Sequence, residues 1–230
     1  MLRLELAKPA GSIYRILCLG SHCDDIEIGC GGTILRLLEE HPNVAVHWVV
    51  FTSTPARAEE ARRSATAFLE QAGSKEILIK EFEDGFMPYN GREVKTFFEE
   101  LKARISPDLI FTHYRHDLHQ DHRLISELTW NTWRDHLILE YEVPKYDGDF
   151  GTPNFFVELE ESLCQRKTRR IVEYFGSQQQ KHWFAEETLL AVLRLRGMEC
   201  RAATRHAEAF YSRKLVLGSY SGTTLTSLID

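Results

Sequence analysis

Two short polar segments hold the residues of this 230-residue chain that are best suited to chemistry. The first, GSHCDDIEIGCGGT, covers residues 20–33 and contains a histidine and two adjacent aspartates. The second, THYRHDLHQDHR, covers residues 112–123 and contains four of the ten histidines. Imidazole nitrogens and carboxylate oxygens are the ligands of a catalytic zinc, which keeps one position open for water. A divalent cation would also relieve the repulsion between the two neighbouring carboxylates.

Each polar segment follows an apolar run that predicts a buried strand. These runs are IYRILCLG at residues 13–20 and DLIF at residues 108–111. In open parallel α/β sheets, ligands bind beyond the carboxyl ends of the strands. We therefore expect both segments to lie on the same edge of one sheet, where they can face each other.

Strand-like and helix-like patterns alternate through the first 140 residues. Further strands are expected at residues 44–52, 76–80 and 136–142. Helices are expected at residues 31–40, 57–73, 92–105 and 121–133. Strands separated by helix-length segments imply right-handed crossovers, which predict a Rossmann-like, mostly parallel sheet with helices on both faces.

The glycines of the first segment do not form a nucleotide-binding loop. Gly29, Gly31 and Gly32 do not fit G-x-G-x-x-G, and no P-loop lysine follows them. We expect them to let a helix pack closely against the sheet.

The alternating pattern stops at VPKYDGDFGTPN, residues 143–154, which we interpret as a loop of a length that is often functional. Two helices, at residues 161–175 and 185–197, and a possible strand at residues 207–217 follow. We expect a single domain of residues 1–230, with a core at about 12–142 and a C-terminal helical extension at about 143–230.

The composition of the chain argues against several classes of protein and of binding partner. A net charge of −6 argues against a nucleic-acid backbone as the main partner. No apolar run approaches the ~20 residues that span a bilayer, and the N-terminal stretch lacks the apolar region of a signal peptide. The five cysteines lack zinc-ribbon spacing and are interpreted as reduced thiols. We expect a cytoplasmic protein with no nucleic-acid or membrane partner.

Together, SHCDDIEIGCGGT and PDLIFTHYRHDLHQDHR resemble the two motifs of the PIG-L/LmbE family of zinc-dependent N-deacetylases. That family carries a His-Pro-Asp-Asp motif followed by glycines, and a later Asp-x-His-x-Asp-His motif. The similarity extends more loosely over most of the chain, including Arg57 to Ala61 and Ala207 to Phe210. Cys23 stands where proline is usual in the family, and we interpret it as a tolerated small residue.

The resemblance implies one zinc ion per chain, although other divalent metals are possible, with His22, Asp25 and His122 as its ligands. It also implies that Asp24 is the general base acting on the metal-bound water. A fully extended chain would pair His22 with Asp24 instead of Asp25. The implied ligand set therefore requires a turn between Cys23 and Asp25.

Further roles follow from the resemblance. His119 would stabilise or protonate the tetrahedral intermediate, with Asp121 orienting it, and Arg57 would contact the substrate. Asp117 is expected to contact the substrate or to orient a histidine. Because three protein ligands suffice for a catalytic zinc, His113 and His116 are expected to lie beside the ligand set.

The implied reaction is hydrolysis of an N-acetyl amide on an N-acetylglucosamine-type sugar or glycoconjugate, by an enzyme that forms a homo-oligomer. Two alternatives remain open. A metal-dependent phosphoesterase also uses paired aspartates, and it would hold about two metal ions. A Rossmann-like binding module would keep the fold without catalysis.

Overall fold

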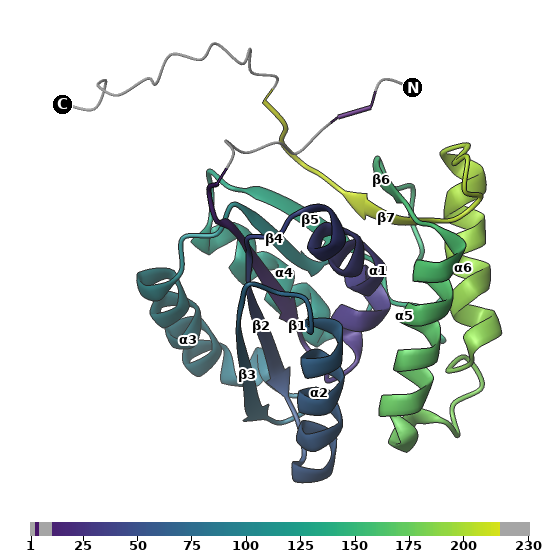
Figure 1. The fold of residues 1–230 in the computed structure, drawn as a ribbon. Helices are drawn as coiled ribbons and strands as arrows, with labels where there is room; N and C mark the ends of the chain where they lie inside the picture. The colour runs from purple at the N-terminus through teal and green to yellow at the C-terminus, as the bar shows by residue number, and fades with distance from the viewer. Residues whose placement is uncertain (1–2, 5–10, 217–230) are drawn as a thin grey trace.

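Seven strands pair side by side in the order β3-β2-β1-β4-β5-β7-β6 (Figure 1). The computed structural model describes residues 3–4 and 11–216. The strands are β1 (Tyr14–Gly20), β2 (Val44–Thr52), β3 (Ser74–Phe82), β4 (Leu109–His113), β5 (Leu137–Tyr141), β6 (Phe155–Glu158) and β7 (Ala207–Tyr211). The first five pair in parallel, and β7 is antiparallel to both β5 and β6. The expected mostly parallel α/β sheet is confirmed.

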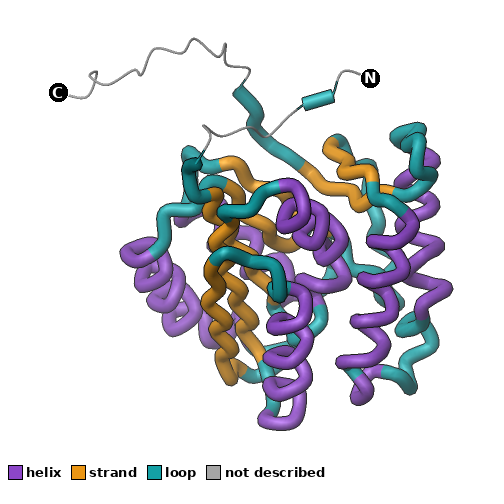
Figure 2. The backbone as a smooth tube through the Cα atoms, viewed as in Figure 1, coloured by secondary structure: helices purple, strands orange, loops and turns teal. Residues whose placement is uncertain are grey.

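Helices cover both faces of the sheet, as Figure 2 shows by colour. They are α1 (Asp25–Glu40), α2 (Pro55–Phe68), α3 (Gly91–Arg104), α4 (Gln120–Thr132), α5 (Glu161–Tyr174) and α6 (Glu186–Glu199). Short 3₁₀ turns occupy Met87–Asn90 and Gly176–Gln178. In the part of the chain that the structure describes, no helix is both long and apolar enough to cross a membrane.

The two faces of β1 belong to different hydrophobic cores. Ile16 and Cys18 pack in a cluster with apolar residues of α1, α2, α5 and α6. Leu17 and Leu19 pack in a second cluster with residues of α3 and α4. A strand buried on both faces reads as a continuous apolar run, which is why this strand could be predicted from the sequence.

Helix α1 begins at Asp25, six residues before the expected start, so the prediction of its first residue was wrong. All three glycines lie inside the helix. A Cβ added to Gly29 would lie 2.0 Å from Cδ2 of Tyr141, and one added to Gly31 would lie 2.7 Å from Cε1 of Phe68. The expectation that these glycines permit close packing is confirmed, and that packing holds the helix despite their low helix propensity.

Gly29→Ala is expected to lower the free energy of unfolding by about 1–3 kcal/mol, because the new methyl group overlaps the buried Tyr141 ring. Urea denaturation measures the change. Gly91→Ala in α3 is the matched control, since nothing lies within 4 Å of its added Cβ. Equal stability of Gly29→Ala and the wild type would show that α1 can move away from Tyr141 at no cost.

The segment after residue 142 completes the sheet. Helices α5 and α6 are confirmed, and the expected strand at residues 207–217 is the shorter β7; Leu217 lies outside the described residues. Strand β6 was not predicted. It has only four residues and pairs with β7 alone. The expected division into a core and an extension stays a prediction, although β5 and β7 pair directly.

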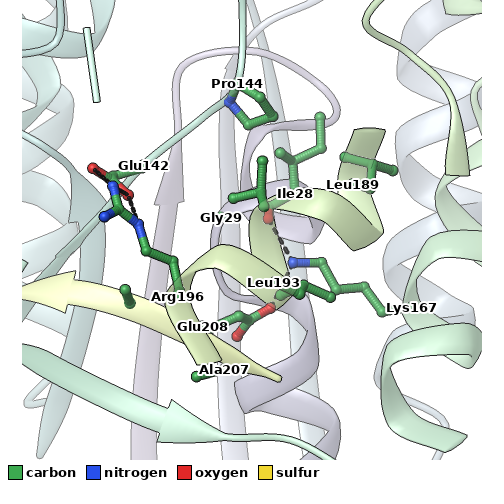
Figure 3. Close-up of a pocket in the computed structure, with 12 residues that line it drawn as sticks. Ile28, Gly29, Glu142, Pro144, Lys167, Leu189, Leu193, Arg196, Ala207 and Glu208 are labelled. Atoms are coloured by element: carbon green, nitrogen blue, oxygen red, sulfur yellow. Dashed lines mark hydrogen bonds and ion pairs between the residues drawn. The ribbon is translucent and has the colours of Figure 1, made fainter. Parts of the chain in front are cut away.

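A buried ion pair joins this later segment to α1 (Figure 3). Lys167 of α5 donates to Oε1 of Glu208 and to the carbonyl of Ile28, both at 2.6 Å. The Glu208 carboxylate accepts from the amides of Gly32, at 2.7 Å, and Thr33, at 2.6 Å. In a regular helix the amide of residue 32 donates to the carbonyl of residue 28. Here Glu208 of β7 binds that amide, and Lys167 of α5 binds that carbonyl. Helix α1, which begins at Asp25, is thus held from the C-terminal part of the chain.

Candidate metal centre and active site

The two polar segments meet at the carboxyl ends of β1 and β4, which are neighbours in the sheet. After β1 the chain turns at Cys23 and Asp24, and α1 begins at Asp25. The turn that the implied ligand set requires is therefore present. It lets the backbone amide of His22 donate to Oδ2 of Asp25 at 2.6 Å. After β4, His122 lies in the first turn of α4.

The structure brings His22, Asp25 and His122 into one buried cluster. Nδ1 of His22 lies 3.0 Å from Nε2 of His122 and 3.2 Å from Oδ2 of Asp25. Nε2 of His122 lies 3.4 Å from the same carboxylate oxygen. Ligand atoms about 2.0–2.1 Å from a tetrahedral zinc are about 3.3 Å apart, so these three atoms have the spacing of a ligand set. The cluster could hold a metal ion.

Charge in the cluster is balanced around Asp25. Burial raises the pKa of its carboxyl, but the charges of His122, His22 and His113 lower it by more, so the net pKa lies well below its usual range. For His122 the effects have the opposite signs. Burial lowers the pKa of its ring, but Asp25 and Asp117 raise it by more, so the pKa lies above its usual value. A metal ion displaces the protons from such ligands, and its own positive charge then replaces the charge of those protons.

Asp117 lies against His122 and is only 2% exposed. Its Oδ2 is 2.9 Å from Nδ1 of His122, and its Oδ1 accepts from the backbone amide of His119 at 2.8 Å. Of the two roles expected for Asp117, the contact with a histidine is present. The expected contact with substrate has almost no exposed surface to support it.

Asp24 is buried and pairs with a cation of α2. Its Oδ1 accepts from Nη2 of Arg57 at 2.8 Å, and Arg57 lies in the first turn of α2. The buried Nε of Arg57 has no hydrogen-bond partner among the described residues. The structure therefore pairs the expected general base with the expected substrate contact.

His119 caps α4 and is half-buried beside the cluster. Its ring centre lies 4.6 Å from that of His22 and 4.7 Å from that of His122. Burial and the charges of His22 and His122 lower its pKa. The backbone amide of Asp121 donates to its Nδ1 at 3.3 Å, so the proton of the neutral ring resides on Nε2.

The carboxylate of Asp121 contacts the turn after β3 and the ring of His22. Its Oδ2 accepts from the amide of Gly85 at 2.7 Å and lies 3.5 Å from Nε2 of His22. The backbone amide of Asp121 donates to the His119 ring, and an oxygen of its carboxylate lies within 4.8 Å of a ring nitrogen of His119. The expected orienting role stays a prediction.

Sequence reasoning did not identify Asp84. Its Oδ1 lies 3.0 Å from Nε2 of His22, and this hydrogen bond lowers the pKa of the Asp84 carboxyl. Asp84 follows β3, so the rule that ligands gather beyond strand ends could have found it.

His113, expected to lie beside the ligand set, is the last residue of β4, and with Asp25 and His122 it forms a group that could itself hold a metal ion. Its Nε2 lies 3.2 Å from Oδ2 of Asp25 and accepts from the Ser21 amide at 2.9 Å. Its ring stacks on that of His122, with centres 3.8 Å apart. Burial and the charge of His122 lower its pKa to about 4, so the ring is neutral at pH 7. His116, by contrast, is exposed.

Cys23, at the position of the family's proline, is buried and separate from the cluster. Its thiol donates to the carbonyl of Thr52 at 3.5 Å. Burial raises the pKa of the thiol to about 12, so it stays protonated at neutral pH. This agrees with its interpretation as a small buried residue.

Comparisons with known proteins agree on the fold and on one family. A family model described as "PIG-L: GlcNAc-PI de-N-acetylase" matches residues 17–133. The uncharacterized deacetylase YaiS of Escherichia coli (strain K12) is 29% identical over 172 residues, which cover 69% of this chain and 89% of YaiS.

Two solved structures share the fold. N,N'-diacetylchitobiose deacetylase from Pyrococcus horikoshii has a TM-score of 0.65 at 21% identity, over 90% of this chain and 86% of that chain. GalB, the 4-carboxy-2-hydroxymuconate hydratase from Pseudomonas putida KT2440, has a TM-score of 0.72 at 18% identity, over 90% of this chain and 99% of that chain.

Proposed function

Because the chain belongs to the PIG-L family, we propose that it is a zinc-dependent hydrolase that removes the N-acetyl group from an N-acetylglucosamine-type sugar or glycoconjugate. The observation that carries the proposal is the ligand-like spacing, 3.0 to 3.4 Å, of one carboxylate oxygen and two imidazole nitrogens. A cytoplasmic location and a homo-oligomeric assembly are part of the same proposal.

The proposed zinc ligands are His22, Asp25 and His122, a nitrogen and oxygen donor set that suits this metal. Bound there, zinc supplies Lewis acidity, which makes water a competent nucleophile near neutral pH. The three side chains are already buried and mutually oriented, so little reorganisation is needed to bind the ion.

Asp24 is the proposed general base, which takes a proton from the water as that water attacks the acetyl carbonyl. Its hydrogen bond from Arg57 fixes the direction of the carboxylate. The side chain of Arg57 is 19% exposed, and we propose that it contacts the substrate as well.

His119 is the proposed hydrogen-bond donor to the oxyanion, and the departing amine is proposed to take up the proton that Asp24 removed from the water. The Asp121 amide that donates to Nδ1 supports this role, because it leaves the proton on Nε2. Asp117 is proposed to orient His122, in place of a contact with substrate.

The fold alone does not select this chemistry, since the structural neighbours include a hydratase as well as a deacetylase. Amide hydrolysis is favoured by the family model and by YaiS, both of which match at the level of sequence. A phosphoesterase would show itself by a second metal ion and by release of phosphate.

The deciding experiment measures metal content together with acetate release from a panel of N-acetylglucosamine derivatives. We expect about one zinc per chain and acetate from at least one derivative. Phosphate-ester and unsaturated dicarboxylate panels run in parallel as comparators. Zinc-loaded protein that acts on either comparator panel and releases no acetate would overturn the proposal.

A further inference from the structure

We propose that Lys145 is a positioning residue of the metal centre, which acts through Asp117 to fix the ring of His122. The loop of residues 143–154 would then be part of the metal site. This inference rests on the proposed function, because it concerns the same zinc ligands.

The first step is the contact between Asp117 and His122. Nδ1 of His122 is 2.9 Å from Oδ2 of Asp117, while Nε2 of the same ring points into the ligand cluster. A carboxylate on the far nitrogen of a ligating histidine sets the tautomer and the orientation of the ring. The position of Nε2 therefore depends on Asp117.

The second step is the contact between Lys145 and Asp117. Nζ of Lys145 donates to the same Oδ2 atom at 2.9 Å and to Oδ2 of Asp149 at 2.5 Å. The three side chains are only 11%, 3% and 7% exposed, in the order Lys145, Asp117, Asp149. Without the ammonium group, two buried carboxylates would face each other, and Asp117 would have to turn toward water. That turn would release the ring of His122.

The third step is the attachment of the loop to its surroundings. Oδ2 of Asp149 accepts from the backbone amide of Leu118 at 2.7 Å, so the loop is bonded both to Asp117 and to the residue that follows it. Further along, the carbonyl of Gly151 accepts from Nη2 of the buried Arg196 at 3.2 Å. These hydrogen bonds hold the loop backbone in place, and they therefore fix the position of Lys145 relative to Asp117.

The test compares zinc affinity, by competition with a chromophoric chelator, in wild type and Lys145→Met. We expect roughly tenfold weaker binding, the lower end of the range for outer partners of metal ligands. We also expect a changed visible absorption spectrum of the cobalt-substituted protein, because that spectrum reports ligand geometry. Lys145→Arg keeps the charge and is expected to recover most of the affinity.

Lys167→Met is the matched control. Lys167 is also a buried ammonium paired with a carboxylate, at 3% and 2% exposure, but it contacts none of the proposed ligands. We expect this variant to lose stability and to keep both its zinc affinity and its cobalt spectrum. If Lys145→Met fails to fold, Lys145→Gln, which keeps an N–H donor without the charge, takes its place.

A double-mutant cycle shows whether Lys145 acts through Asp117. Asp117→Asn should weaken zinc binding by about 10–100-fold, and adding Lys145→Met should weaken it by less than about twofold more. Additive losses, or a Lys145→Met protein with wild-type affinity and spectrum, would overturn the inference. A wild-type protein that binds no zinc would instead overturn the proposed function.

Discussion

Asp24→Asn is expected to lower kcat by about 10²–10⁴-fold, the contribution typical of a general base, while the protein keeps its zinc. The amide oxygen of asparagine can still accept the hydrogen bond that Arg57 donates at 2.8 Å, so the local structure should persist. Because Asp24 is not one of the three proposed ligands, the metal-binding atoms are left in place. Acetate release gives the rate, and elemental analysis gives the zinc content.

Glu27→Gln is the control for Asp24→Asn. Glu27 is a fully buried carboxyl group in the helix that follows Asp24, but it accepts from the Ser64 hydroxyl at 2.6 Å and has no place in the proposed chemistry. We expect this variant to turn over substrate normally. Normal turnover by Asp24→Asn as well would remove Asp24 from the mechanism and leave the general base to be found elsewhere.

His122→Ala is expected to lose both zinc and turnover. The substitution removes one of three ligand atoms, so affinity should fall by more than the roughly 100-fold that bounds the loss of an outer partner. That ligand atom is the Nε2 that lies 3.0 Å from Nδ1 of His22. Zinc content after dialysis and the rate of acetate release are measured on the same preparation.

The control for His122→Ala is His136→Ala, at a histidine whose Nδ1 contacts the exposed Asp135. This variant should keep one zinc per chain and the full rate. If His122→Ala also kept its zinc, the ligand set would have to include another of the clustered side chains, such as the nearby His113.

The position of the site could be predicted from the sequence, because a buried strand can be recognised from the residues of the strand itself. The runs that became β1 and β4 are continuous apolar stretches, and the polar residues after them had to share one edge of a parallel sheet. The start of α1 could not be predicted in the same way. Three glycines in four residues argue against a helix, and only their contacts with side chains such as Tyr141 explain why one forms.

Loop paths account for what the sequence could not predict at the site. The pairing of Asp24 with Arg57 depends on how α2 begins, and the contact of Asp84 with His22 depends on the turn after β3. Lys145 reaches Asp117 only because the 143–154 loop folds back over the end of β4. Hydrophobic periodicity and secondary-structure propensity describe single segments, and they do not predict side-chain contacts between segments that are far apart in the sequence.

The place of β7 in the sheet has a consequence for how the chain is made. Strand β6 pairs with β7 and has no bonded neighbour in the sheet until residues 207–211 have left the ribosome. The Glu208 carboxylate that holds the amides of α1 arrives with the same late segment. Pairings this distant in sequence form slowly and leave an open strand edge meanwhile. Strand β7 also covers β5, so the nascent protein must keep the open edge of β5 from other chains until residues 207–211 have been synthesised.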